Sequence, residues 1–398
     1  MQAVVNIGMV GHVDHGKTTL TEALTGKWTD THSEELRRGI SIKLGFSDVS
    51  FYRCPSCGRY SNKPKCPFCA SPAEFSRRVS FVDAPGHEML MATVLSGAMV
   101  MDGAILVIAA NEPCPQPQTR EHLTALQIVG VKKVVVAQNK IELVGEKALE
   151  HYEQIRRFLS NTPYANAPII PISAIHRANL DKLIEALERE IPTPQHDPTL
   201  PARMLTIRSF DVNYPGAKPE ELKGGVLGGT LRQGRIKVGD EIEIKPGITV
   251  GGTCRPLTTK VVTLQAEKTP LKEARPGGLI GVGTLLDPSL TKADGLAGSR
   301  VGEVGKLPPV VQTLELEVHL MERVVGTAEQ LEAKPLVPNE MLVVTVGTAT
   351  CLGTITKLRG ERVEVRLKSP TCVDQGERVA VSRKVGGRWR LAGHGIVL

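Results

Sequence analysis

Gly11, Gly16, Lys17 and Thr18 have the types and spacing needed to hold phosphate groups. They lie in Gly-His-Val-Asp-His-Gly-Lys-Thr, directly after the apolar run 4–10 and directly before a predicted helix. Glycines let backbone N–H groups converge on phosphate oxygens, the lysine reaches the β- and γ-phosphates, and the hydroxyl binds Mg²⁺. A chance glycine-rich turn is the alternative for this motif alone, and further motifs in the right order weaken that alternative.

Asp83 and Gly86 form the second such motif, at the end of the predicted strand 79–83. An Asp in this position can hold the metal through water, and a Gly N–H can sense the γ-phosphate. Both roles require this strand end to lie beside the phosphate loop.

Two later strand ends carry residues suited to reading a base. The carboxylate of Glu142 can accept hydrogen bonds from N1–H and the exocyclic amine of guanine, whereas adenine lacks that paired donor edge. We therefore predict GTP or GDP as the nucleotide. Most G proteins have Asp at this position, and the extra methylene moves the carboxylate by about one bond length, so guanine selectivity should survive. The base-reading residues are Asn139, Lys140, Glu142, Ser173, Ala174 and Ile175.

Four cysteines form two Cys-x-x-Cys pairs. Four thiolates at this spacing suit tetrahedral Zn²⁺, and a closed four-cysteine site leaves no open position, so the metal should be structural. A reduced, metal-free loop or a redox pair is the alternative. The predicted zinc ligands are Cys54, Cys57, Cys66 and Cys69. The cysteines without metal-ligand spacing, interpreted as packed or surface thiols, are Cys114, Cys254, Cys351 and Cys372.

Short β-branched runs alternate with helical stretches in the first half of the chain, which predicts a mostly parallel sheet with helices on both faces. Asn179 is expected to cap the last helix of this domain. Prolines then interrupt the chain at 191–198, and glycine-punctuated short strands follow, which predicts two β-barrels. The expected domains are an α/β P-loop domain at 1–197 with a zinc knuckle inserted at 51–75, a first barrel at 198–306 and a second barrel at 307–398.

The 398 residues are 41% hydrophobic and 23% charged, which is ordinary for a globular chain of two to three domains. No apolar run is long enough to span a bilayer and no signal peptide is evident, so we expect a cytoplasmic protein without a membrane partner. The net charge of +7 comes entirely from residues 200–398. The segment 357–390 is especially basic, and either a polyanion or a solvated mixed-charge surface explains it.

Three segments together resemble the elongation- and initiation-factor branch of GTPases. They are Gly-His-Val-Asp-His-Gly-Lys-Thr-Thr at 11–19, Arg-Arg-Gly-Ile-Ser at 37–41 and Asp-Ala-Pro-Gly-His at 83–87. The resemblance places Ile40 and Ser41 in the first switch and His87 in the second. Ser41 stands where the family usually has Thr, which keeps the Mg²⁺-binding hydroxyl but loses a methyl group.

The resemblance also implies roles for individual residues. His87 would position the attacking water, and Val13 and Ile40 would form an apolar gate beside it. Because no arginine finger is identifiable, hydrolysis should be slow and accelerated by a partner. The implied magnesium ligands are Thr18 and Ser41, with Asp14 and Gly39 at a second Mg²⁺. The nucleotide-binding residues are Asp14, His15, Gly16, Lys17, Thr18, Thr19, Asp83, Gly86, Asn139, Lys140, Glu142, Ser173, Ala174 and Ile175.

The position of the cysteine segment narrows the resemblance, because ordinary elongation factors lack an insertion between the first switch and the strand ending at Asp83. Together with the segments 108–122, 139–142, 208–213 and 388–391, it resembles the gamma-subunit family of archaeal initiation factor 2. This resemblance implies a heterotrimer, with an alpha subunit docked on the first barrel and a beta subunit on the GTP-binding domain. It implies methionylated initiator tRNA as cargo, and the small ribosomal subunit with its mRNA as destination.

Two other functions compete with this one. A selenocysteine-specific elongation factor also delivers an unusual tRNA, but would normally have a further C-terminal domain and no zinc insertion. The GTPase subunit of a sulfate-activating enzyme has the same loop and barrels, but regulates a small-molecule transferase and should also lack the knuckle.

Overall fold

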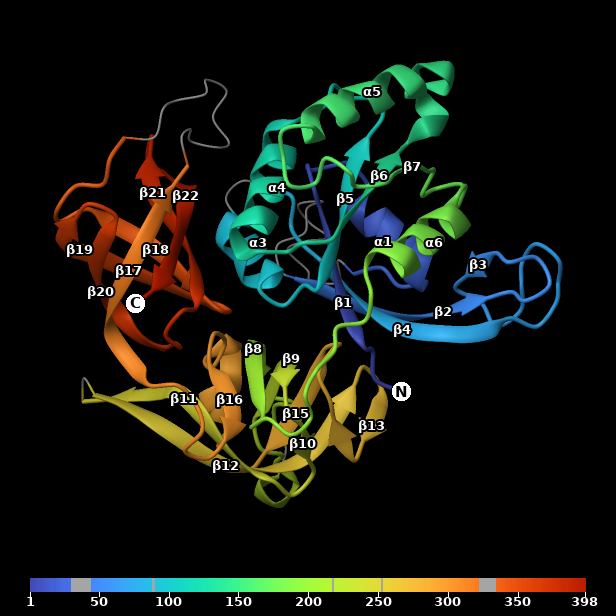
Figure 1. Cartoon of the computed structure of the whole chain (residues 1–398). Helices are drawn as coiled ribbons and strands as arrows, with labels where there is room; N and C mark the ends of the chain where they lie inside the picture. Colours follow the sequence, from blue (N-terminus) through green and yellow to red (C-terminus); the bar gives the residue numbers. More distant parts are fainter. Residues whose placement is uncertain (30–43, 88–89, 217, 252, 322–333) are drawn as a thin grey trace. The chain divides into compact units, whose positions relative to one another are not determined.

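The computed structural model describes residues 1–29, 44–87, 90–216, 218–251, 253–321 and 334–398. Within this part the chain forms two compact units that divide between Pro194 and Gln195. One unit contains a sheet with helices, and the other contains two barrels (Figure 1). The predicted segment Arg37–Ser41, with Gly39 and Ile40, lies outside the described residues.

The sheet of the first unit has seven strands in the order β3-β2-β4-β1-β5-β6-β7. The central strands β4, β1, β5, β6 and β7 run parallel, while β2 and β3 are antiparallel to their neighbours. The strands are β1 (Val5–Gly11), β2 (Gly45–Arg53), β3 (Tyr60–Ser61), β4 (Glu74–Asp83), β5 (Gly103–Ala109), β6 (Val134–Asn139) and β7 (Ile169–Pro171).

Helices cover both faces of this sheet. On one face Ile105 and Val107 of β5 belong to a core with leucines of α1 and α6, while Leu106 and Ile108 are buried on the opposite face. A parallel strand buried on both faces reads as a continuous apolar run, which is why the sequence identified it. The helices are α1 (Lys17–Thr25), α3 (Met91–Ala98), α4 (Pro117–Val129), α5 (Ala148–Leu159) and α6 (Leu180–Glu190), with the 3₁₀ turns η2 (Ile141–Leu143) and η3 (Gly145–Lys147).

Two details differ from the expectations. The strand β2 was not predicted, because it lacks the continuous apolar run by which the parallel strands were identified. Polar residues alternate along it with the buried Val49 and Phe51, which is the pattern of a strand with one buried face. Asn179 occupies the N-cap position of α6, as predicted, but it does not cap the helix through its side chain. Its backbone is left-handed, with φ 58°, whereas residues that cap through a side-chain oxygen usually have an extended backbone. Its Nδ2 donates to the carbonyl of Pro171, and its side chain makes no cap hydrogen bond.

The first barrel closes through pairing of β11 with both β16 and β12. Its core consists of aliphatic side chains such as Met204, Leu227 and Val301. Its strands are β8 (Arg203–Phe210), β9 (Val226–Gln233), β10 (Ile236–Lys237), β11 (Glu241–Val250), β12 (Thr253–Ala266), β13 (Thr269–Leu271), β14 (Glu273–Ala274), β15 (Ile280–Thr284) and β16 (Arg300–Glu303). The short helices are η4 (Pro219–Glu221), α7 (Pro288–Thr291) and η5 (Lys292–Asp294).

The second barrel is a closed ring of six antiparallel strands in the order β17-β20-β19-β18-β21-β22. Leu316, Val344 and Val365 are among the side chains that fill it. Its strands are β17 (Val310–Leu320), β18 (Met341–Val346), β19 (Ala349–Arg359), β20 (Arg362–Cys372), β21 (Arg378–Val385) and β22 (Arg388–Val397). The predicted fold class, an α/β domain followed by two β-barrels, is confirmed.

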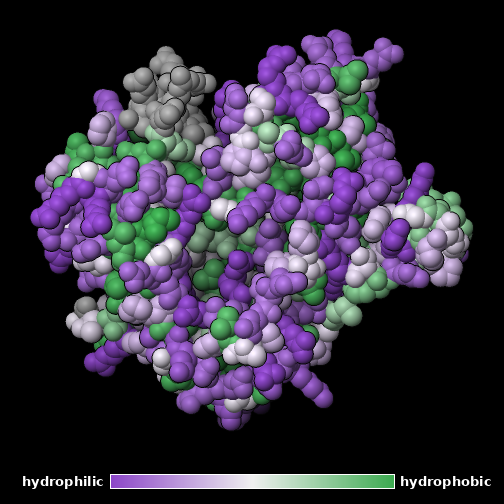
Figure 2. Space-filling model, in the orientation of Figure 1, coloured by the Kyte–Doolittle hydropathy of each residue, from purple (hydrophilic) through white to green (hydrophobic). Residues whose placement is uncertain are grey.

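The surface in Figure 2 is mostly hydrophilic, with hydrophobic residues in separate patches. Of the helices in the described part of the chain, none is long and apolar enough to cross a membrane.

Candidate functional site

The predicted nucleotide residues meet at the carboxyl edge of the sheet. Gly11, Asp83 and Asn139 are the last residues of β1, β4 and β6, and Ser173 follows β7. Because these strands are parallel, their carboxyl ends lie along one edge, where ligands of open α/β sheets bind.

The phosphate loop is held in shape by its two glycines. Gly11 has φ +142°, and a Cβ there would lie 2.3 Å from the carbonyl oxygen of Val107. Gly16 has φ +88° and precedes α1 without a side-chain cap, so the first N–H groups of this helix are available to an anion. Lys17 is buried and its Nζ donates to the carbonyl of His12 at 2.6 Å, folding the amine back over the loop.

Asp83 draws two hydroxyl groups to one carboxylate oxygen. Thr18 Oγ1 lies 3.0 Å and Thr29 Oγ1 lies 2.7 Å from Asp83 Oδ2. Hydroxyl and carboxylate oxygens are hard donors of the kind that Mg²⁺ prefers. A Cβ on Gly86 would lie 2.6 Å from Lys17 Nζ and 2.9 Å from the backbone nitrogen of Val13. The residues present at this point therefore fit a magnesium-bound triphosphate approached closely by the backbone of Gly86.

Asn139 connects the phosphate loop to the base-reading segments. Its Nδ2 donates to the carbonyl of His15 at 3.0 Å, and its Oδ1 accepts from the N–H of Ala174 at 3.0 Å. Glu142 is exposed in η2, as is Ile175 after β7. An exposed carboxylate beside this anchored loop is able to accept from a base.

His15, predicted to contact the nucleotide, points its ring into the domain. The ring is fully buried, with Nδ1 3.2 Å from the carbonyl of Val107 and Nε2 3.4 Å from Glu112. Burial lowers the pKa of His15 to about 4, so the ring is neutral at physiological pH. His15 can therefore bind a phosphate group only through its backbone N–H.

His122 is a site residue that the sequence did not single out. It lies in α4, and its Nδ1 accepts from the N–H of Gly11 at 2.8 Å. Burial lowers its pKa to about 3. The segment 108–122 contributes to the resemblance to initiation factors, but nothing in its local spacing links His122 to a loop more than a hundred residues earlier.

His87 follows Gly86 directly and is half-buried. Val13, predicted to form the apolar gate with Ile40, is also half-buried in the phosphate loop, whereas Ile40, Ser41 and Gly39 lie outside the described residues. The close approach of Gly86 to Val13 puts the segment bearing His87 next to the loop.

The four predicted zinc ligands converge. Their sulfur atoms lie within 4.8 Å of one another, with Cys54 Sγ 3.4 Å from Cys69 Sγ and Cys57 Sγ 3.6 Å from Cys66 Sγ. Zn–S bonds of about 2.3 Å in a tetrahedron place sulfurs about 3.8 Å apart. The cluster therefore has the donor type, number and size that Zn²⁺ requires.

Two matching turns build this cluster beyond the ends of β2 and β4 (Figure 1). The N–H of Gly58 donates to the carbonyl of Cys54, and the N–H of Ala70 donates to the carbonyl of Cys66, at 2.9 and 3.0 Å. Gly58 and Ala70 both have positive φ. Because β2 runs to Arg53 and β4 begins at Glu74, the ends of the predicted 51–75 insertion are strand residues.

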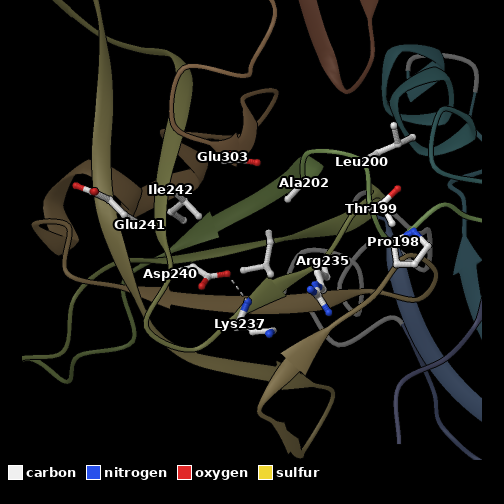
Figure 3. A pocket seen from close by; sticks show the side chains of 11 residues that line it. Pro198, Thr199, Leu200, Ala202, Arg235, Lys237, Asp240, Glu241, Ile242 and Glu303 are labelled. Atoms are coloured by element: carbon white, nitrogen blue, oxygen red, sulfur yellow. Dashed lines mark hydrogen bonds between the residues drawn. The ribbon is translucent and has the colours of Figure 1, made fainter.

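A separate pocket of about 690 Å³ lies in the first barrel (Figure 3). Arg235 and Lys237 line it together with Asp240 and Glu303, and the N–H of Lys237 donates to Asp240 Oδ2 at 2.8 Å. None of the residues predicted to bind the nucleotide or zinc lines this pocket.

Family comparisons agree with the arrangement along the chain. Residues 2–193 match the Elongation factor Tu GTP binding domain, residues 224–295 match Elongation factor Tu domain 2, and residues 312–397 match Initiation factor eIF2 gamma, C terminal. Translation initiation factor 2 subunit gamma of Pyrococcus horikoshii is 63% identical over 401 residues, covering 100% of this chain and 98% of that protein. This chain belongs to that gamma-subunit family. Its relative from Methanocaldococcus jannaschii is 60% identical over 401 residues, with the same coverage.

As a member of the gamma-subunit family, the chain is a GTP-dependent subunit of a translation initiation factor, with a GTPase domain of the translation-factor type. GTP or GDP and Mg²⁺ follow from the GTPase family. The full-length matches do not favour the two alternative functions.

Solved structures give the same fold. The bacterial selenocysteine-specific elongation factor EF-Sec matches with a TM-score of 0.77 and 24% identity, covering 100% of this gamma-family chain and 58% of that one. Elongation factor SelB from Methanococcus maripaludis, in complex with the GTP analogue GppNHp, matches with a TM-score of 0.72 and 22% identity, covering 100% and 79%. At these identities the likeness concerns the fold alone.

Proposed function

We propose that this chain, with GTP bound, carries methionylated initiator tRNA to the small ribosomal subunit and releases it after hydrolysis. The observation that supports the proposal is that one chain combines two features. Asn139 connects the phosphate loop to the segment at Ala174, and the C-terminal barrel matches the initiation-factor type. Such a factor works in the cytoplasm, where it meets the ribosome and its mRNA.

The nucleotide is held from three sides. The N–H groups of residues 14–19 cradle the phosphates with Lys17, and Gly86 contacts the γ-phosphate through its N–H. Glu142 accepts from the guanine edge while Lys140 and the segment 173–175 flank the base. Losing the γ-phosphate removes the contact to Gly86 and relaxes the second switch.

Hydrolysis requires a water in line with the γ-phosphorus. His87 positions this water, and Val13 and Ile40 exclude other waters. The water oxygen forms a new P–O bond as the bond to the GDP oxygen breaks, and the proton that the water gives up passes to phosphate oxygen or solvent. Mg²⁺, when bound, neutralises charge on the β- and γ-phosphate oxygens. Thr18 and Ser41 would hold it directly and Asp83 through water, with Asp14 and Gly39 at a second ion.

The cysteine cluster has a structural role and stabilises the knuckle. Cys54, Cys57, Cys66 and Cys69 would hold one Zn²⁺ that fastens the two turns to each other. The knuckle is also attached to the sheet domain, because Asn62 Nδ2 donates to the carbonyl of Leu24 at the end of α1.

The partners are alpha and beta subunits in a heterotrimer, with the alpha subunit on the first barrel and the beta subunit on the GTP-binding domain. The net positive charge of residues 200–398 suits the tRNA backbone. Binding to tRNA should therefore weaken steeply as salt rises.

The affinity of the chain for methionylated initiator tRNA tests this proposal. It is measured with and without the alpha subunit, in the GTP-analogue and GDP states, with an elongator tRNA as control. Tighter binding of the initiator tRNA in the GTP-analogue state supports the proposal. Equal, weak binding in every state contradicts it and leaves a GTPase with another cargo.

A further inference from the structure

A histidine of α4 occupies a place under the phosphate loop where an apolar side chain would be expected. His122 is fully buried, and the neighbouring helix positions Leu123, Ala125 and Leu126 are buried apolar residues. Its ring meets the loop at one atom, where Nδ1 accepts from the N–H of Gly11 at 2.8 Å.

The hydrogen bond fixes the protonation of this ring. A donor faces Nδ1, so Nδ1 carries no proton and Nε2 carries the only one. Burial, together with the charge of Lys17, lowers the pKa of His122 to about 3 and keeps the ring neutral. Nε2 is buried and has no hydrogen-bond partner among the described residues.

An unpartnered buried N–H is unfavourable, and a leucine would avoid it. The feature that a leucine cannot supply is the acceptor for Gly11. The imidazole thus supplies an acceptor, Nδ1, to the N–H of Gly11, although its Nε2–H is left without a hydrogen-bond partner among the described residues.

Gly11 is the residue where β1 becomes the phosphate loop. On one side it pairs with Val107 of β5, so closely that a Cβ would lie 2.3 Å from the carbonyl oxygen of Val107. On the other side its N–H points to His122. These two contacts fix where the loop leaves the sheet, and with it the direction of the N–H groups that follow.

We propose that His122 is a positioning residue for nucleotide binding, which fixes the first turn of the phosphate loop through the N–H of Gly11 without touching the nucleotide. The inference rests on the nucleotide site proposed above. Without the acceptor Nδ1, the N–H of Gly11 no longer holds the start of the loop in place, so bound GDP should dissociate faster.

Two substitutions separate this role from simple packing. His122→Leu keeps volume but removes the acceptor, whereas His122→Asn is smaller but places its Oδ1 near the position of Nδ1. If His122 only fills space, the asparagine variant should release nucleotide faster and unfold at a lower temperature than the leucine variant. If His122 positions the loop, the leucine variant should release nucleotide faster, even though it unfolds at the higher temperature of the two.

The experiment measures the release rate of a fluorescent GDP analogue and the midpoint of thermal unfolding for the full chain and each variant. His151→Leu is the matched control, because His151 is also buried and also uses Nδ1, which lies 3.1 Å from Nε2 of Gln138, a residue outside the phosphate loop. We expect His122→Leu to speed release by about tenfold, as for a lost buried hydrogen bond. His122→Asn and His151→Leu should stay within about threefold of the unchanged chain.

Other outcomes overturn the inference. Release rates that follow the unfolding midpoints, with the asparagine variant fastest, would show a packing role. Equal rates of GDP release from the leucine variant and the unchanged chain would mean that His122 does not position the phosphate loop. Failure of the unchanged chain to bind GDP would instead contradict the proposed function.

Discussion

Asn139 holds the phosphate loop at the carbonyl of His15, with Nδ2 and the carbonyl oxygen 3.0 Å apart. The same amide accepts from Ala174 through Oδ1, so one buried side chain joins three segments of the nucleotide site. Nucleotide affinity should depend on this bridge even where no atom of Asn139 contacts a phosphate.

Replacing Asn139 with Ala removes both buried hydrogen bonds. At about 1.5 kcal/mol each, GDP affinity should fall by about 100-fold. Titration calorimetry measures this, with Asn161→Ala, an exposed asparagine in a turn after α5, as the control. Equal affinities of the two variants would mean that the bridge does not support binding.

Gly16→Ala tests the packing of the loop against this same amide. A Cβ on Gly16 would lie 2.4 Å from Asn139 Nδ2, and the residue has φ +88°. Gly26→Ala is the matched control, because Gly26 has φ +76° but open space around it. Both variants should lose about 1 kcal/mol of unfolding free energy through backbone strain, and Gly16→Ala alone should also lose GDP affinity. An equal GDP affinity in both would exclude the collision as a cause.

The sequence predicted those parts of the site that are determined by strand ends. Asp83 and Asn139 each follow a buried apolar run, and parallel strands necessarily bring their ends to one edge. The set of four clustered cysteines was also predictable, because the short spacing within each Cys-x-x-Cys turn brings two sulfur atoms together.

The parts not predicted depend on side-chain direction or on distant partners. The motif at 11–18 cannot show that the ring of His15 turns inward to Val107, since this direction follows from the backbone of the loop. His122 and Thr29 meet the site only after the chain folds, and no spacing in the sequence links them to Gly11 or Asp83.

His87→Ala should leave GTP affinity nearly unchanged while slowing stimulated hydrolysis by about 100-fold or more, the scale of a lost positioning group. Single-turnover hydrolysis in the presence of small ribosomal subunits measures this. His176→Ala, at an exposed histidine after β7, is the control and should hydrolyse GTP normally. An unchanged rate for His87→Ala would remove His87 from the proposed mechanism.

Cys54→Ser should lower the zinc content of the purified chain, because Cys54 is buried and its sulfur lies 3.4 Å from that of Cys69. Atomic absorption gives the ratio of zinc to protein. Cys254→Ser, in β12 and outside the cluster, is the control and should keep its zinc. If both variants contain the same zinc, Cys54 is not a ligand.

His394 should make the stability of the chain depend on pH. Burial and the nearby Arg378 lower its pKa to about 4, and its Nε2 lies 2.8 Å from Arg378 Nη2. In the unfolded chain the ordinary value is 6.5, so between about pH 6.5 and 4 the unfolded state binds more protons than the folded state. The contribution of His394 to the free energy of unfolding is therefore complete above pH 6.5 and is lost as the pH falls toward 4.

The variant His394→Gln tests this effect, because glutamine keeps a polar side chain near Arg378 but cannot titrate. Urea unfolding at pH 7 and pH 5 should show a smaller loss of stability for this variant than for the unchanged chain, since all other groups titrate alike in both. Equal losses in the two proteins would mean that His394 is not the group that titrates.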